Sequence, residues 1–171
     1  NIKAANPDII FAPSSITTAP LIIKQARELG ITATIAAGDT WENSTIIENA
    51  GEQAEGVVLS TFFDEAEPAN DEAAAFIKGF KEYLKSQKQE EIIPAVSALG
   101  YDSYLAAIKA IEDANSTDPA AIRDALAKVK IEGVTGTITF NETGDANKNL
   151  AFIKVIKDGK FQFLTTTTIS D

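Results

Sequence analysis

The sequence predicts an α/β fold in which short parallel strands alternate with helices. Residues 8–12 and 31–38 are apolar runs with several β-branched side chains, which is typical of strands. Between them, residues 17–29 place apolar side chains at helical intervals, and Gly30 then offers a C-terminal stop. A strand, a helix and a second strand joined by short loops form a right-handed parallel unit. The first part of the chain is therefore expected to build a parallel sheet.

The end of the chain predicts a β-hairpin. Asp158-Gly159 separates two alternating runs, 152–156 and 161–168, and this dipeptide favours the tight turn of a hairpin. An acidic, proline-containing stretch at residues 64–70 is the best candidate for a linker. The remaining expected elements, in chain order, are a helix at 43–50, a strand at 57–63, helices at 71–86, 101–115 and 118–129, and a strand at 136–140. Asn43 or Ser44 is the expected cap of the helix at 43–50, Asp102 that of the helix at 101–115, and Asp118 that of the helix at 118–129.

Composition restricts the classes of function. The chain has 171 residues with 25 acidic and 15 basic side chains, a net charge of −10, and no basic patch that would attract nucleic acid. Cysteine and histidine are absent, which excludes disulfides, thiol nucleophiles and histidine metal ligands or proton relays. The loop at 141–147 superficially resembles a calcium loop, but Ala146 and Phe152 stand where glycine and glutamate belong. We therefore expect neither a metal nor a cofactor.

Asp39 is the most informative candidate residue. It follows the run at 31–38 and therefore lies at the carboxyl end of a predicted parallel strand, beside the loop at residues 13–16. Ligands of open α/β sheets bind at that edge. Trp41, the only tryptophan, comes two residues later, and a carboxylate beside an aromatic ring suits a small ammonium-bearing ligand. Two other interpretations stay open: Asp39 as an exposed loop acid or cap, and Trp41 as a core aromatic.

Several short strings along the chain carry a resemblance to a known family. The chain resembles the solute-binding proteins of ABC transporters for branched-chain amino acids, which are type I periplasmic binding proteins of the Leu/Ile/Val-binding kind. The matches run in order over nearly the whole chain, and no single string would suffice. The strings are residues 4–11, 23–30, 54–57, 98–102, 122–126 and 133–140.

That resemblance implies two Rossmann-like α/β lobes with a ligand held between them. Residues 1–62 would belong to lobe 2 and residues 63–149 to lobe 1, and residues 150–171 would return to lobe 2. The lobes would be present only in part, without the N-terminal half that carries most of lobe 1 and the groups that bind the ligand's carboxylate. We therefore expect a C-terminal fragment that self-associates or exchanges strands through its uncovered edges.

The resemblance also implies roles for individual residues. Asp39 matches the position of an acid that binds the ligand's α-ammonium group, and Trp41 would form a wall of the pocket. Tyr101 would face the cleft from the other lobe. Many members carry a pair of tyrosines where this chain has Ser15 and Ile16, which leaves the Ser15 hydroxyl as a candidate donor. A branched-chain or other apolar amino acid, a small amide or an aromatic acid are the candidate ligands.

The predicted function is that of an extracytoplasmic substrate-binding component of an ABC transporter, in the periplasm or on the cell surface as a lipoprotein. It would pass its amino acid to a membrane permease without chemical change. Two alternatives stay open. One is a ligand-sensing domain of a receptor or regulator with the same fold. The other is a doubly wound enzyme that uses Asp39 and Glu42 as acid and base.

Overall fold

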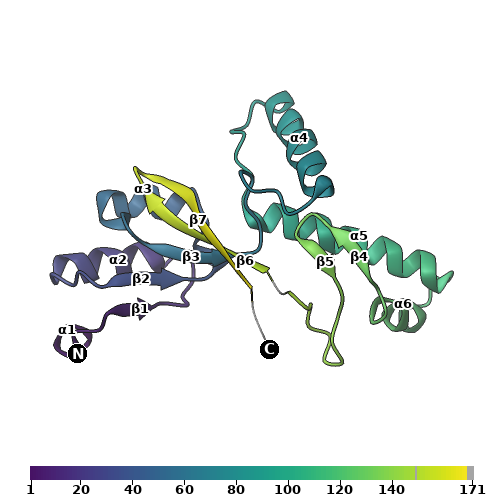
Figure 1. Cartoon of the computed structure of the whole chain (residues 1–171), viewed down its shortest axis with the longest axis horizontal. Coiled ribbons are helices and arrows are strands. Elements are labelled where there is room, and N and C mark those ends of the chain that lie inside the picture. The colour runs from purple at the N-terminus through teal and green to yellow at the C-terminus, as the bar shows by residue number, and fades with distance from the viewer. Residues whose placement is uncertain (149, 169–171) are drawn as a thin grey trace. The chain divides into compact units, whose positions relative to one another are not determined.

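Two compact units make up the chain (Figure 1). The computed structural model describes residues 1–148 and 150–168. Among the described residues, the first unit contains Asn1–Thr61 and Phe152–Thr167, and the second contains residues 62–148, 150–151 and 168. The chain therefore leaves the first unit directly after Thr61 and re-enters it at Phe152.

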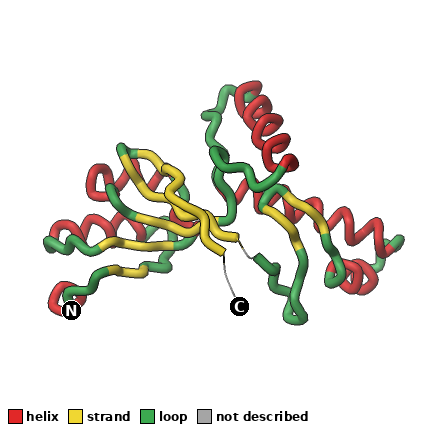
Figure 2. Tube along the Cα trace, in the orientation of Figure 1, coloured by secondary structure: helices red, strands yellow, loops and turns green. Residues whose placement is uncertain are grey.

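A five-stranded sheet forms the first unit, with the strand order β1-β2-β3-β6-β7. β1, β2 and β3 pair in parallel, with Ile10 opposite Ile35 and Ala36 opposite Val58. β6 runs antiparallel to β3, and Figure 2 shows the strands lying side by side. The parallel strands and the C-terminal hairpin expected from the sequence are both confirmed. The strand bounds are Ile9–Phe11 for β1, Thr34–Ala37 for β2, Val58–Thr61 for β3, Leu150–Lys157 for β6 and Lys160–Thr168 for β7.

Helices connect the parallel strands and bury the apolar side chains of the sheet. Ile23 on α2 and Ile46 on α3 are fully buried and belong to one apolar core with Ile35 of β2. On the edge strand β1, by contrast, Ile9 and Phe11 remain 56% and 67% exposed. The helices of this unit are α1 (Ile2–Ala5), α2 (Ala19–Glu28), the 3-10 helix η1 (Asp39–Trp41), α3 (Ser44–Ala50) and the 3-10 helix η2 (Gly51–Ala54).

Local sequence signals account for several element ends. Asn43 Oδ1 accepts a hydrogen bond of 2.9 Å from the backbone N–H of Thr45, and Asp118 Oδ1 accepts one of 3.0 Å from the N–H of Ala121. These contacts confirm the predicted caps Asn43 and Asp118, because both satisfy N–H groups that have no partner within the helix. In the hairpin turn Asp158-Gly159, φ is 53° and 67° at the two positions, as a tight turn of this type requires.

In its described residues, the second unit contains three helices and a short hairpin. Helix α4 has the predicted range, but α5 begins at Ala95, with Pro94 as its N-cap residue. The prediction of Asp102 as a cap is therefore wrong, because the helix-forming residues before Gly100 carry the helix through this glycine. No helix in the described part of the chain is long and apolar enough to cross a membrane. The elements are α4 (Asp71–Ser86), α5 (Ala95–Ala114), α6 (Pro119–Leu126), β4 (Ile131–Gly133), which the sequence did not predict, and β5 (Gly136–Ile138).

Asp102 instead holds the turn between β4 and β5. Its buried carboxylate accepts hydrogen bonds from the backbone N–H groups of Val134 (2.7 Å) and Thr135 (2.9 Å), and from the Thr135 hydroxyl. A Cβ on Gly133 would collide with the Asp102 carboxylate, so this close approach requires glycine. The Lys148 ammonium donates to Thr135 Oγ1, and burial lowers the pKa of Lys148 while the charge of Asp102 partly opposes that shift.

The segment predicted as a solvated linker, residues 64–70, is bound at both ends. Asp64 is only 5% exposed, and its carboxylate accepts a hydrogen bond of 2.8 Å from the N–H of Ala66. Asn70 caps α4 and donates a hydrogen bond of 2.9 Å to the carbonyl of Gly133. Aspartate and asparagine form such local turns readily, so an acidic composition did not make this segment a free linker.

Candidate functional site

Asp39 starts the 3-10 helix η1 just beyond the carboxyl end of β2, which is where the sequence placed it. Its side chain is half-buried. Within the described part of the chain, its carboxylate makes no side-chain hydrogen bond or ion pair. A carboxylate held at the edge of a parallel sheet without a partner is suited to bind a cationic group. Its role as a ligand-binding acid stays a prediction.

Ser14 fixes η1 to the loop that follows β1. The Ser14 carbonyl accepts a hydrogen bond of 2.9 Å from the indole N–H of Trp41 and a longer one, 3.4 Å, from the Thr40 hydroxyl. Trp41 is fully buried in the core of the first unit. The indole therefore supports η1, the turn that begins at Asp39 (the Asp39 turn), from within the core. This agrees with the interpretation of Trp41 as a core aromatic. Direct contact of Trp41 with a ligand would require its cover to move, and it stays a prediction.

Ser15 is exposed on the same loop. Its hydroxyl lies 2.9 Å from the hydroxyl of Thr17 and 3.2 Å from that of Thr18, so the three hydroxyls form a local turn at the start of α2. Ile16, the next residue, packs against the core. The Ser15 hydroxyl is accessible, and its use as a ligand donor stays a prediction.

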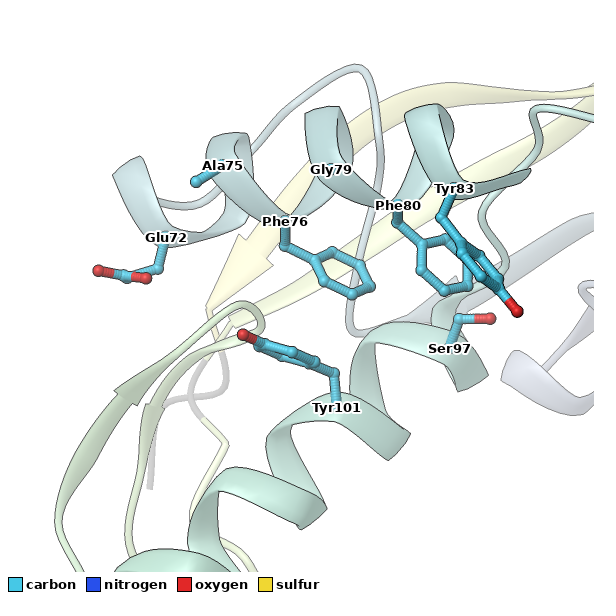
Figure 3. Close-up of a pocket in the computed structure, with 8 residues that line it drawn as sticks. All are labelled: Glu72, Ala75, Phe76, Gly79, Phe80, Tyr83, Ser97 and Tyr101. Carbon is cyan, nitrogen blue, oxygen red and sulfur yellow. The ribbon is translucent and has the colours of Figure 1, made fainter. Parts of the chain in front are cut away.

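Tyr101 belongs to the second unit, where it lines a cavity of about 510 Å³ between α4 and α5 (Figure 3). The ring centroids of Tyr101 and Phe76 are 4.9 Å apart, and Phe76 stacks on Phe80 at 5.3 Å. Tyr101 is 43% exposed, so part of this side chain remains open to solvent. The structure thus brings Asp39, Trp41 and the Ser15 loop together in the first unit and places Tyr101 in the second.

A buried ion pair that the sequence did not predict lies next to η1. Glu42 Oε1 pairs with the Lys154 ammonium, and Glu42 Oε2 accepts a hydrogen bond of 3.0 Å from the Thr61 hydroxyl. The Glu42 and Lys154 side chains are 7% and 5% exposed. Because its carboxylate is already neutralised, Glu42 is poorly placed to act as a base beside Asp39, which weakens the enzyme alternative.

One sequence signal could have placed Lys154 in the interior. Along β6, Phe152 and Ile156 alternate with less buried residues, and Lys154 shares their buried face. A lysine at such a position needs a carboxylate partner. Nothing in the local sequence identifies Glu42 as that partner.

The polar loop after β5 is closed by its own hydrogen bonds. Asn141 Oδ1 accepts from the N–H of Thr143 (3.0 Å), from the Thr143 hydroxyl (2.8 Å) and from the N–H of Asp145 (2.8 Å). Hydrogen bonds from Thr143 and Asn141 lower the pKa of Asp145. Among the described residues, no group of three or more acidic side chains is arranged to hold a metal ion.

Comparison with known proteins places this geometry in a family. The model of the periplasmic binding protein family matches residues 1–160. The leucine-, isoleucine-, valine-, threonine- and alanine-binding protein of Pseudomonas aeruginosa is 31% identical over 153 residues, which is 88% of this chain and 38% of that protein. A Leu/Ile/Val-binding protein homologue of Brucella melitensis is 29% identical over 93% of this chain and 42% of its own length.

Solved structures give the same result. The leucine-binding protein LivK of Thermotoga maritima is 32% identical, has a TM-score of 0.85, and is matched over 98% of this chain and 49% of its own. The binding protein LivJ of Streptococcus pneumoniae, solved with isoleucine, is 25% identical with a TM-score of 0.76, over 99% of this chain and 48% of its own. The chain thus spans about half the length of these two solved relatives. It spans 38% and 42% of the length of the two curated relatives. Because the family model matches nearly all of this chain, the chain belongs to the periplasmic binding protein family.

Proposed function

We propose that the chain forms part of an extracytoplasmic substrate-binding protein of an ABC transporter, and that this protein binds a branched-chain or other apolar amino acid. The family, and relatives described as leucine- or isoleucine-binding, support this proposal. In it, residues 1–62 and 150–171 belong to lobe 2 and residues 63–149 to lobe 1. The ligand is captured between the lobes by hinge closure and passed to a membrane permease.

The carboxylate of Asp39 is the observation that carries the proposal. It is half-buried at the carboxyl edge of the sheet and has no partner among the described side chains. The α-ammonium group of an amino acid supplies the missing positive charge through a charge-assisted hydrogen bond. Glu42, the other acid of this turn, already has Lys154 as its partner. A single available acid fits the binding of one ammonium group better than paired acid and base catalysis.

The loop at residues 13–16 carries no charged side chain, which favours a ligand with an apolar side chain. Ser15 offers one accessible hydroxyl, and the Ser14 hydroxyl is buried without a hydrogen-bond partner among the described residues. Ile16 is half-buried and packs against the apolar core. A leucine or isoleucine side chain is compatible with this loop, whereas a charged ligand side chain would find no oppositely charged partner on it.

Asp39→Asn tests the proposal in a full-length chain that supplies both lobes. The substitution keeps the shape of the side chain and removes its charge. We expect the affinity for isoleucine, measured by titration calorimetry, to fall at least about tenfold, which corresponds to about 1.4 kcal/mol. Glu48→Gln, which removes one exposed charge from α3, is the matched control and should leave the affinity unchanged. An Asp39→Asn protein with the affinity of the parent would refute the assignment.

A separate expectation concerns the 171-residue chain by itself. β1 is an edge strand on which Ile9 and Phe11 are largely exposed, and such edges pair with other chains. We expect light scattering to detect dimers or larger species as the concentration rises, and Phe11→Lys to reduce them. Leu21→Lys on α2, where leucine is also 57% exposed but not on a strand edge, is the control. A monomer at every concentration would contradict the expectation.

A further inference from the structure

Glu42, Thr61 and Lys154 form a buried polar network in the first unit. The carboxylate of Glu42 uses both oxygens, one for the Lys154 ammonium and one for the Thr61 hydroxyl, at 3.0 Å. Thr61 and Lys154 are 1% and 4% exposed. Burying two opposite charges costs solvation energy that their mutual attraction repays only with good geometry, and an apolar pair of similar size is often as stable. Fold stability alone therefore does not explain the network.

The network is connected to the Asp39 turn through the backbone. The N–H of Glu42 donates a hydrogen bond of 2.9 Å to the carbonyl of Asp39 and so closes η1. The same residue therefore completes the turn with its backbone and anchors it with its side chain. On the other side, the indole of Trp41 ties the turn to the Ser14 carbonyl at 2.9 Å. η1 is thus held from two directions, by an indole and by an ion pair.

The other two members of the network lie on the strands by which the chain changes units. Thr61 is the last residue of β3 and of the first unit before the chain continues at Phe62. Lys154 lies on β6, close to the re-entry at Phe152, and the register places Phe152 opposite Thr61. Both crossing strands therefore contact the side chain that anchors the Asp39 turn.

We propose that Glu42, Thr61 and Lys154 are positioning residues, which hold the Asp39 carboxylate in register with the two crossing strands. The proposal rests on the proposed function, in which Asp39 binds the ligand's ammonium group. None of the three residues contacts the ligand in this scheme. Their effect is exerted through the backbone of η1, so a loss of the network displaces the Asp39 carboxylate and weakens the bond to the ammonium group.

The test separates positioning from folding with the double variant Glu42→Met/Lys154→Met. Methionine preserves much of the side-chain volume and removes both charges, so the melting temperature should stay close to that of the parent. Trp41, the only tryptophan, belongs to the same turn and reports on it directly. We expect quenching of Trp41 fluorescence by acrylamide to rise about twofold in the 171-residue chain. In a full-length chain, the affinity for isoleucine should fall about tenfold.

Two further variants complete the experiment. Lys109→Met/Asp113→Met removes an exposed ion pair from α5 and should change neither quantity. Thr61→Val replaces only the hydroxyl with a methyl group, and it should change quenching and affinity in the same directions as the double variant, by smaller factors. It also decides the question if the double methionine variant does not fold. Unchanged quenching and affinity, with Asp39→Asn still losing isoleucine, would overturn the positioning role and leave the proposed function intact. If quenching increases in the double methionine variant but Asp39→Asn keeps its affinity for isoleucine, the network positions the turn and Asp39 is not the ammonium ligand.

Discussion

Asp102→Ala is expected to destabilise the 171-residue chain by about 3–5 kcal/mol. The substitution leaves the buried N–H groups of Val134 and Thr135, and the Thr135 hydroxyl, without their acceptor. Each unsatisfied buried donor costs about 1–3 kcal/mol. Urea unfolding followed by circular dichroism measures the loss. The charge of Asp102 also opposes the lowering of the Lys148 pKa, so the pKa of Lys148 should fall further in the variant.

Asp102→Asn and Gly133→Ala define the origin of this effect. The asparagine retains one acceptor oxygen but directs an amide NH₂ at a donor, so it should recover only part of the stability. Gly133→Ala keeps every hydrogen-bonding group and adds one methyl against the Asp102 carboxylate, which should cost about 1–3 kcal/mol through overpacking. If Asp102→Ala unfolds at the same urea concentration as the parent, the carboxylate does not hold the hairpin.

Glu42→Ala is expected to destabilise the chain by a similar amount, about 3–5 kcal/mol, because it leaves the ammonium of Lys154 buried without its carboxylate. The double variant Glu42→Met/Lys154→Met should recover most of the loss, since neither charge is then buried. Thermal and urea unfolding of the parent, Glu42→Met, Lys154→Met and the double methionine variant form a cycle that isolates the pair.

Lys109→Ala provides the control for the Glu42 variant. Lys109 pairs with Asp113 on the surface of α5, where the two side chains are 43% and 46% exposed. Exposed pairs of this kind contribute about 0–1 kcal/mol, so this variant should unfold almost as the parent does. Equal losses in Glu42→Ala and Lys109→Ala would mean that burial does not determine the energy of the Glu42 pair.

Local patterns were sufficient for most of the secondary structure. The range of α4, the caps Asn43 and Asp118 and the parallel order of the first strands depend on residues that are close in sequence. β4, at Ile131–Gly133, was missed because a run of three residues that contains a glutamate and a glycine has no strand periodicity of its own. Its pairing with β5 supplies the missing stability.

Only those parts of the candidate site that depend on local sequence could be predicted. Asp39 was located from the end of β2, which is a local feature. Asp102 was misassigned as a cap because the prediction used only its neighbours in sequence. Its hydrogen-bond partners, Val134 and Thr135, lie 32 and 33 positions away. The Glu42–Lys154 pair spans 112 positions, and no local pattern connects its members. Tertiary contacts of this kind determine which acid is free and which is neutralised.

The two units of the chain also differ in their aromatic residues. The single tryptophan, Trp41, lies in the first unit, and all three tyrosines, Tyr83, Tyr101 and Tyr104, lie in the second. Tryptophan emission and near-ultraviolet tyrosine dichroism therefore report on different halves of the molecule during one denaturation. Coincident transitions would show that the halves melt as one cooperative system, and separated transitions would give each half its own stability without any added label.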